Sequence, residues 1–174
     1  MTLKSVLAGL AIVLSAGAAS ANSDVIPAPN TTFTPYGKVG DWNVFVNEDR
    51  KTCMIERVDA VENVLQMGLT ADRGVGYLGI FTKADIGLES GTEAIAVLIG
   101  DSLYAGQVRT LTTSLRDGYA GGYILSDDPK FVEDIMQQYE MIVLPETQFA
   151  FVLSLEGTMK AIEAARECNA AQTG

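Results

Sequence analysis

The sequence predicts a single α+β domain: a mainly antiparallel β-sheet with two helices of the C-terminal half packed on it. Short apolar runs with two-residue alternation, separated by turn sequences, follow one another between Trp42 and Leu125, as in antiparallel strands. Two segments with helical spacing come after them, starting near Asp128 and Thr158. No repeat or linker divides these parts of the 174-residue chain. Residues 36–174 are therefore expected to share one core.

The first residues have the pattern of a cleavable export signal. Lys4 supplies a positive charge, Val6–Leu14 form a short apolar run, and Ala19-Ser20-Ala21 is a small-residue cleavage site. The apolar run is too short to anchor the chain in a bilayer. We therefore expect a signal peptide over residues 1–21, cleavage after Ala21, and a periplasmic or secreted protein without an integral membrane segment.

The mature chain is expected to start with an extended segment ahead of the domain. Residues 22–35 contain Pro27, Pro29 and Pro35 among small and polar residues. Proline removes a backbone donor and restricts its neighbour, so such a stretch favours extended chain over regular structure.

The strands are expected to pair mainly with their neighbours in sequence. Trp42–Val46 and Thr52–Val58 flank the polar turn Asn47–Lys51 and predict a hairpin. Asp117-Gly118 predicts another. The other expected strands are Asn63–Thr70, Tyr77–Thr82, Glu93–Ile99, Ser102–Ala105, Val108–Leu115, Tyr119–Leu125 and Gln148–Leu155, with a short apolar segment at Met141–Leu144.

The two helices are predicted from caps and from periodicity. Asp128 is a good N-cap and Pro129 suits the first helical position. Phe131, Ile135 and Tyr139 then recur every four residues and should share the buried face. The second helix is expected from about Thr158 to Asn169, with an inward stripe of Ala161, Ile162, Ala165 and Cys168.

Composition excludes several classes of function. The formal net charge is −10, or −11 once Lys4 is removed, which disfavours nucleic acid and anionic membrane surfaces as partners. The chain has no histidine, so the Ser-His-Asp and Cys-His arrangements and the zinc sites that use imidazole are absent. We expect no metal, no cofactor and no catalytic residues.

A glycine motif offers one apparent exception. Gly74, Gly76 and Gly79 spell G-x-G-x-x-G, but a dinucleotide site needs this motif to open a helix whose free N–H groups meet the pyrophosphate. Here Ile80-Phe81-Thr82 continue as a strand. A glycine-rich turn or bulge is the better interpretation.

Cys53 and Cys168 are the two cysteines of the chain. One interpretation is a reactive thiol or redox pair, although no C-x-x-C spacing and no neighbouring base supports it. The other is a disulfide between the second strand and the last helix, which suits an oxidising compartment. We favour the structural disulfide.

Tyr119 and Tyr123 are the candidate interaction surface. They lie four residues apart on one face of a strand, beside glycines. Such a pair belongs either to the core or to an exposed aromatic patch that binds a partner.

Two stretches resemble the invasion-associated locus B family of exported bacterial proteins. The first is Tyr36–Val44, with its Gly-Asp-Trp-x-Val core, followed by Lys51–Ile55 with Cys53; the second is Phe151–Thr158, followed by Ala161-Ile162. The chain departs from the family by lacking a cysteine soon after the tryptophan strand and a central cysteine pair. The resemblance implies an exported, β-rich, non-enzymatic envelope protein, and it leaves Cys168 as the partner for Cys53.

The leading hypothesis is an exported non-enzymatic binding or protein-interaction module, whose partner is a protein or another envelope component. The alternative is an envelope-polymer hydrolase or an inhibitor-type domain that uses carboxylates brought together by the fold. Carboxylates clustered inside a pocket would favour the alternative, whereas an exposed apolar or aromatic patch would favour the first hypothesis.

Overall fold

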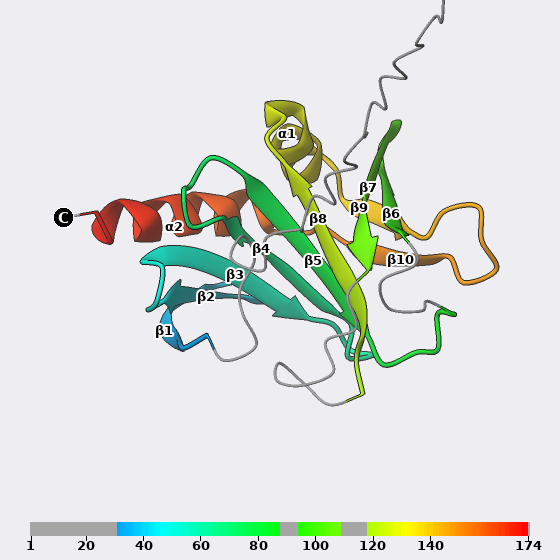
Figure 1. The fold of residues 1–174 in the computed structure, drawn as a ribbon, viewed down its shortest axis with the longest axis horizontal. Coiled ribbons are helices and arrows are strands. Elements are labelled where there is room, and N and C mark those ends of the chain that lie inside the picture. Colours follow the sequence, from blue (N-terminus) through cyan, green and yellow to red (C-terminus); the bar gives the residue numbers. More distant parts are fainter. Residues whose placement is uncertain (1–30, 88–93, 109–117, 174) are drawn as a thin grey trace, which may run out of the picture.

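The structure, a computed structural model, describes residues 31–87, 94–108 and 118–173. Within these residues the chain forms strands and two helices in the arrangement of Figure 1. The elements are β1 (Phe33–Val39), β2 (Trp42–Asn47), β3 (Thr52–Val58), β4 (Val64–Leu69), β5 (Gly76–Thr82), β6 (Ala94–Ile99), β7 (Ser102–Val108), β8 (Ala120–Ser126), α1 (Pro129–Gln137), β9 (Glu140–Val143), β10 (Phe151–Ser154) and α2 (Thr158–Ala171). The predicted signal peptide lies outside the described residues.

One antiparallel sheet holds all the described strands, in the order β1-β2-β3-β4-β5-β8-β7-β6-β9-β10. The sheet curves strongly, so that the end of β10 comes back to β2 and β3. The Trp42 indole Nε1 donates to the Glu156 carbonyl oxygen at 2.9 Å, and Arg57 Nη1 donates to the Ser154 hydroxyl at 3.3 Å. These contacts connect the two ends of the strand order.

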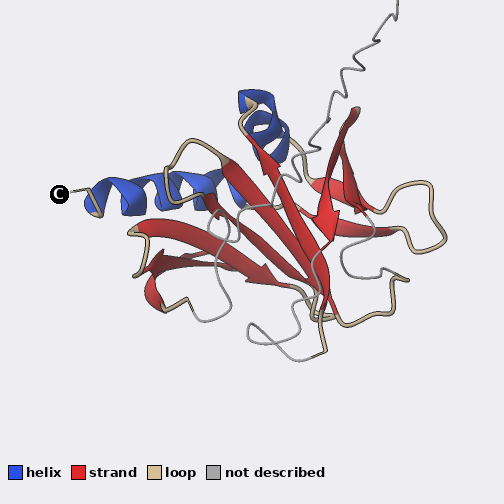
Figure 2. Ribbon diagram, in the orientation of Figure 1, coloured by secondary structure: helices blue, strands red, loops and turns tan. Residues whose placement is uncertain are grey.

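Both helices pack on the sheet around one core (Figure 2). Phe131 and Ile135 of α1, and Ala161 and Ala165 of α2, are buried with the inner faces of the strands. The predicted fold class is therefore confirmed. The small alanines allow α2 to approach β2 and β3 closely.

The disulfide between Cys53 and Cys168 is present, with the α-carbons 6.0 Å apart, and fixes the last turns of α2 to β3. Both side chains are buried. Asn169 strengthens the junction, since its Oδ1 accepts from the Cys53 N–H at 2.9 Å and its Nδ2 donates to the Ala165 carbonyl at 2.8 Å.

The predicted elements that fall on described residues agree with the structure in type, and the differences lie at their ends. The predicted strand Val108–Leu115 lies outside the described residues except for Val108, which ends β7. β1 begins at Phe33, inside the stretch expected to be a free extended segment, and β10 is shorter than the predicted Gln148–Leu155. The proposed hairpin at Asp117-Gly118 falls partly outside the described residues. Tyr139 was predicted on the buried face of the first helix, and this is wrong: α1 ends at Gln137 and Tyr139 is 82% exposed.

The glycine motif belongs to a turn and a strand. Gly76 and Gly79 lie in β5, which continues to Thr82. The ring of Tyr123 covers Gly79, where a Cβ would lie only 2.6 Å from Tyr123 Cε1. Close packing therefore accounts for Gly79.

Candidate functional site

The candidate surface of Tyr119 and Tyr123 is not a surface: the two residues are only 7% and 2% exposed, so this prediction is corrected. They do share one face, as the spacing predicted, but that face carries a second buried cluster with Val64, Tyr77 and Phe81. The Tyr123 ring meets both Tyr77 and Phe81 edge-on. Aromatic packing, not exposure, explains the pair.

A buried series of side-chain hydrogen bonds gives the Tyr123 hydroxyl a partner. It donates to Gln66 Oε1 at 3.1 Å, and Gln66 Nε2 donates to Glu56 Oε2 at 2.8 Å. Burial raises the pKa of Tyr123, so the phenol stays protonated and acts as a donor. These hydrogen bonds link β8, β4 and β3, and their role is structural.

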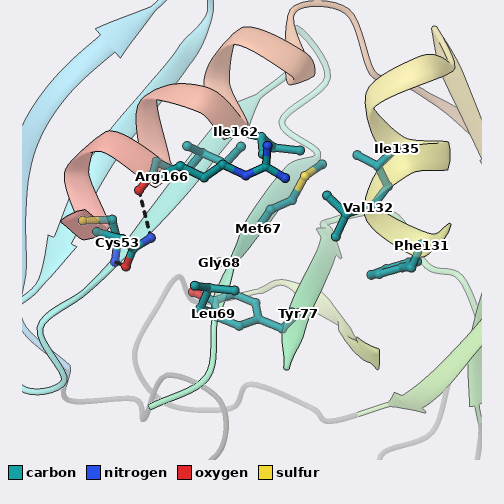
Figure 3. A pocket seen from close by; sticks show the side chains of 14 residues that line it. Cys53, Met67, Gly68, Leu69, Tyr77, Phe131, Val132, Ile135, Ile162 and Arg166 are labelled. Atoms are coloured by element: carbon teal, nitrogen blue, oxygen red, sulfur yellow. Dashed lines mark hydrogen bonds between the residues drawn. The ribbon is translucent and has the colours of Figure 1, made fainter. Parts of the chain in front are cut away.

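An apolar cavity of about 150 Å³ lies between α1, α2 and the ends of β3–β5 (Figure 3). Small residues of both α2 and the strands, Ala165, Gly68 and Gly76, form part of its wall. Its lining consists of Cys53, Ile55, Met67, Gly68, Leu69, Gly76, Tyr77, Phe131, Val132, Ile135, Ile162, Ala165, Arg166 and Asn169. The lining contains no carboxylate.

Arg166 is the charged residue of the cavity. Figure 3 shows its side chain reaching from α2 along the rim, beside Ile162 and toward Met67. Arg166 is exposed, and its side chain makes no ion pair or hydrogen bond with any residue that the structure describes. Asn169, in contrast, is occupied by its bonds to Cys53 and Ala165.

A second feature, which we call the aliphatic row, crosses the outer face of four neighbouring strands. Leu103 of β7 lies opposite Leu98 of β6, Leu98 lies opposite Ile142 of β9, and Ile142 lies opposite Val152 of β10. Leu103 is 65% and Val152 is 55% exposed, and the two residues between them are half-buried. Directly opposed residues share a face, so the four side chains form one continuous stripe.

The aliphatic row is unusual because β6 is apolar on both faces. Its inward residues Ile95, Val97 and Ile99 are fully buried, while Leu98 of the row faces outward. Strands with apolar residues on both faces are typical of sheets that are covered on both sides. The sequence predicts a strand over Glu93–Ile99, but it does not connect this strand to the other members of the row.

A polar cluster next to α1 has the composition of a Ser-Lys dyad but not its electrostatics. Lys130 Nζ lies 2.7 Å from Ser102 Oγ and 2.5 Å from Asp134 Oδ2, and the Tyr104 hydroxyl donates to the same carboxylate at 2.7 Å. The hydrogen bond to Asp134 raises the pKa of Lys130, and the bonds from Lys130 and Tyr104 lower the pKa of Asp134 to about 2. A Lys that activates a Ser must be able to lose its proton, and this one is held charged.

Metal-binding groups and membrane-spanning helices are both absent from the described ranges. No group of three or more His, Cys, Asp or Glu side chains is placed there to hold a metal ion. Neither of the described helices has the length and apolar character needed to cross a membrane.

Comparison with known proteins gives a likeness of fold. No family model and no curated protein sequence matches the chain. Among solved structures, the chain is similar to invasion associated protein B from Bartonella henselae, with a TM-score of 0.49 and 13% identity over 75% of this chain and 95% of that one.

Proposed function

We propose that the protein is an exported, non-enzymatic interaction module that binds a protein partner through the aliphatic row. The observation that carries this proposal is the exposure of Leu103 and Val152 at the two ends of a continuous apolar stripe. An antiparallel sheet with one face on the core normally has polar side chains on the other face. Contiguous exposed apolar surface marks interaction sites.

The dimensions of the row suit a protein surface. Neighbouring strands are about 4.8 Å apart, so four aligned side chains extend over roughly 14 Å. Ala96 and Ala105 form the next row toward one side, which keeps that part of the face flat. A flat apolar centre with a polar rim is the usual anatomy of a protein interface.

Charges beside the row indicate the partner's chemistry. Glu140 is exposed on β9 one row away from Ile142, and Asp101 is exposed in the turn after β6. Arg57 of β3 donates to the hydroxyl of Ser154, the last residue of β10. With the strongly acidic chain as a whole, these carboxylates favour an apolar partner surface with a basic rim.

Two further observations support the proposal over a hydrolase. The cavity lining contains no carboxylate, so it lacks the acid and base that polymer hydrolysis requires. Lys130, the amine beside Ser102, is held charged by Asp134.

The buried disulfide fits an exported protein, because such bonds persist in oxidising compartments.

Site-specific photo-crosslinking in the producing cells tests the proposal. A benzophenone amino acid at Leu103 is expected to give a discrete crosslinked protein, because the side chain lies in the row. The matched control is the same amino acid at Tyr36, which is also exposed but lies on β1, outside the row. The double variant Leu103→Ser/Val152→Ser should fold normally and lose the partner when crosslinked from Ile142.

Three results would overturn the proposal. These are no adduct from Leu103, an equal adduct from Tyr36, and a crosslink only to a second copy of the same chain.

A further inference from the structure

We propose that the cavity between α1 and α2 binds a short alkyl carboxylate, with its tail among Met67, Ile135 and Ile162 and its carboxylate on Arg166. This site is distinct from the aliphatic row, which lies on the outer face of β7, β6, β9 and β10. The proposal therefore stands independently of the protein-binding function.

The size of the cavity limits the class of ligand. Drug-sized ligands and cofactors occupy pockets of roughly 300–1,000 Å³. This cavity measures about 150 Å³, and an engineered apolar cavity of that size in another protein holds benzene. A nucleotide is too large for this volume, whereas a linear tail of about six carbons fits. The apolar lining offers few hydrogen-bond partners to the hydroxyl groups of a sugar.

The chemistry of the lining selects an apolar tail. The side chains that α1 and α2 contribute to the wall are Phe131, Val132, Ile135, Ile162 and Ala165 besides Arg166 and Asn169. The Asn169 amide is occupied by the Cys53 N–H and the Ala165 carbonyl, so it offers the ligand little hydrogen bonding. Water inside would find few partners, and an alkyl chain can displace it without losing hydrogen bonds.

Arg166 at the rim selects the head group. Its planar guanidinium presents two parallel N–H groups that match a carboxylate. No described residue neutralises it, although Glu163 and Glu167 are close in sequence on the same helix. Arg166 supplies one positive charge on a chain whose net charge is −10. A ligand with one negative charge is therefore favoured over a doubly charged phosphate monoester.

The site is held open by the fold. The disulfide and Asn169 fix the C-terminal end of α2 to β3. The Trp42 indole fixes the start of α2 through the Glu156 carbonyl. On the other wall, Phe131 and Ile135 anchor α1 in the core. Because both helices are fixed independently, little ordering has to accompany binding.

The test is a titration followed by methyl NMR of Met67, Ile135 and Ile162, using octanoate as the probe. We expect saturable shifts of these methyl groups with octanoate, and weaker binding of octanol, octylamine and octyl phosphate. From butanoate to octanoate, the dissociation constant should improve roughly tenfold for each two methylene groups, and then level off when the cavity is full.

Variants separate the head from the tail. Arg166→Gln should weaken octanoate binding about tenfold and leave octanol binding unchanged. Lys160→Gln is the matched control, because it removes the same charge from the exposed side of the same helix and should change neither. Val132→Phe should fill the cavity and abolish binding of both probes, and Ile162→Phe serves in its place if the first variant does not fold.

The proposal is overturned if millimolar octanoate leaves the cavity methyl groups unshifted. It is equally overturned if Arg166→Gln and Lys160→Gln weaken binding by the same factor, or if octyl phosphate binds as tightly as octanoate. Loss of binding in the Leu103→Ser/Val152→Ser double variant would place the ligand at the aliphatic row instead. The partner crosslink and the octanoate titration can therefore fail separately.

Discussion

Removal of the disulfide is the perturbation whose effect the structure predicts most directly. The double variant Cys53→Ala/Cys168→Ala breaks a bond that closes a loop with a sequence separation of 115 residues. In the chain-entropy model, a loop of this length stabilises the folded state by about 5 kcal/mol. Alanine is chosen because both positions are buried, and a serine hydroxyl there would need a hydrogen-bond partner.

The variant should still fold, but at a lower temperature. For a domain of this size, 1 kcal/mol corresponds to about 2–4 °C in Tm, so a decrease of roughly 10–20 °C is expected. The domain survives because α2 keeps its other attachments. Asn169 still accepts from the backbone N–H at position 53, and Trp42 still binds the Glu156 carbonyl.

Thermal melting by circular dichroism, with hydrogen exchange on the same samples, measures both effects. Loss of protection should be largest in the last turns of α2, around residue 168, and small near Thr158, where the Trp42 contact persists. Thiol counting on the denatured, non-reduced parent protein is the control and should find no free thiol. A Tm decrease below about 5 °C, or complete unfolding of the variant, would refute the loop-closure reasoning.

Three further predictions follow from single contacts. Gly121→Ala should destabilise the protein by several kcal/mol or prevent folding, because the added Cβ would overlap backbone atoms of β5. Gly37→Ala is the control and should be nearly neutral, because its Cβ meets open space. The midpoints of denaturant unfolding compare the two variants. The pKa of Asp134 is lowered in the folded protein, so its ion pair with Lys130 stabilises the fold above about pH 4 and is lost as the pH falls toward 2. Asp134→Asn should therefore reduce this part of the acid sensitivity by about 1 kcal/mol or less. Acid titrations followed by fluorescence measure the effect, and an unchanged profile would contradict the prediction. Asn169→Leu leaves the N–H of the bonded cysteine in β3 without its acceptor and should cost about 1–3 kcal/mol in urea unfolding; no loss would show that water replaces the side chain.

Local signals in the sequence were sufficient where one residue decides an element's start. Asp128 caps α1 as predicted, with its side chain accepting from the Lys130 N–H at 2.9 Å, and Pro129 begins the helix. The end of α1 was misjudged because Tyr139 continued the four-residue spacing. Its carbonyl instead accepts from the Leu155 N–H at 2.7 Å, which is a contact with a residue sixteen positions later that no local pattern reveals.

The candidate sites show the same division. The spacing of Tyr119 and Tyr123 correctly placed them on one face of a strand, but only the packing of β4, β5 and β8 showed that this face is buried. The apolar run in β6 was visible in sequence. That Leu98 lies between Leu103 and Ile142 depends on cross-strand register, which brings together residues from separate parts of the chain.

The sequence by itself determined the fold class, the order and type of most elements, and the pairing of its two cysteines, because these depend on periodicity, on caps and on there being one partner for Cys53. Only the tertiary structure decided which apolar residues face the core and which face outward, and where the helices leave space between them. Side-chain alternation gives each strand two faces but does not say which one is covered, and a cavity exists only between elements that meet in space. For this reason the aliphatic row and the Arg166 cavity emerged from the fold.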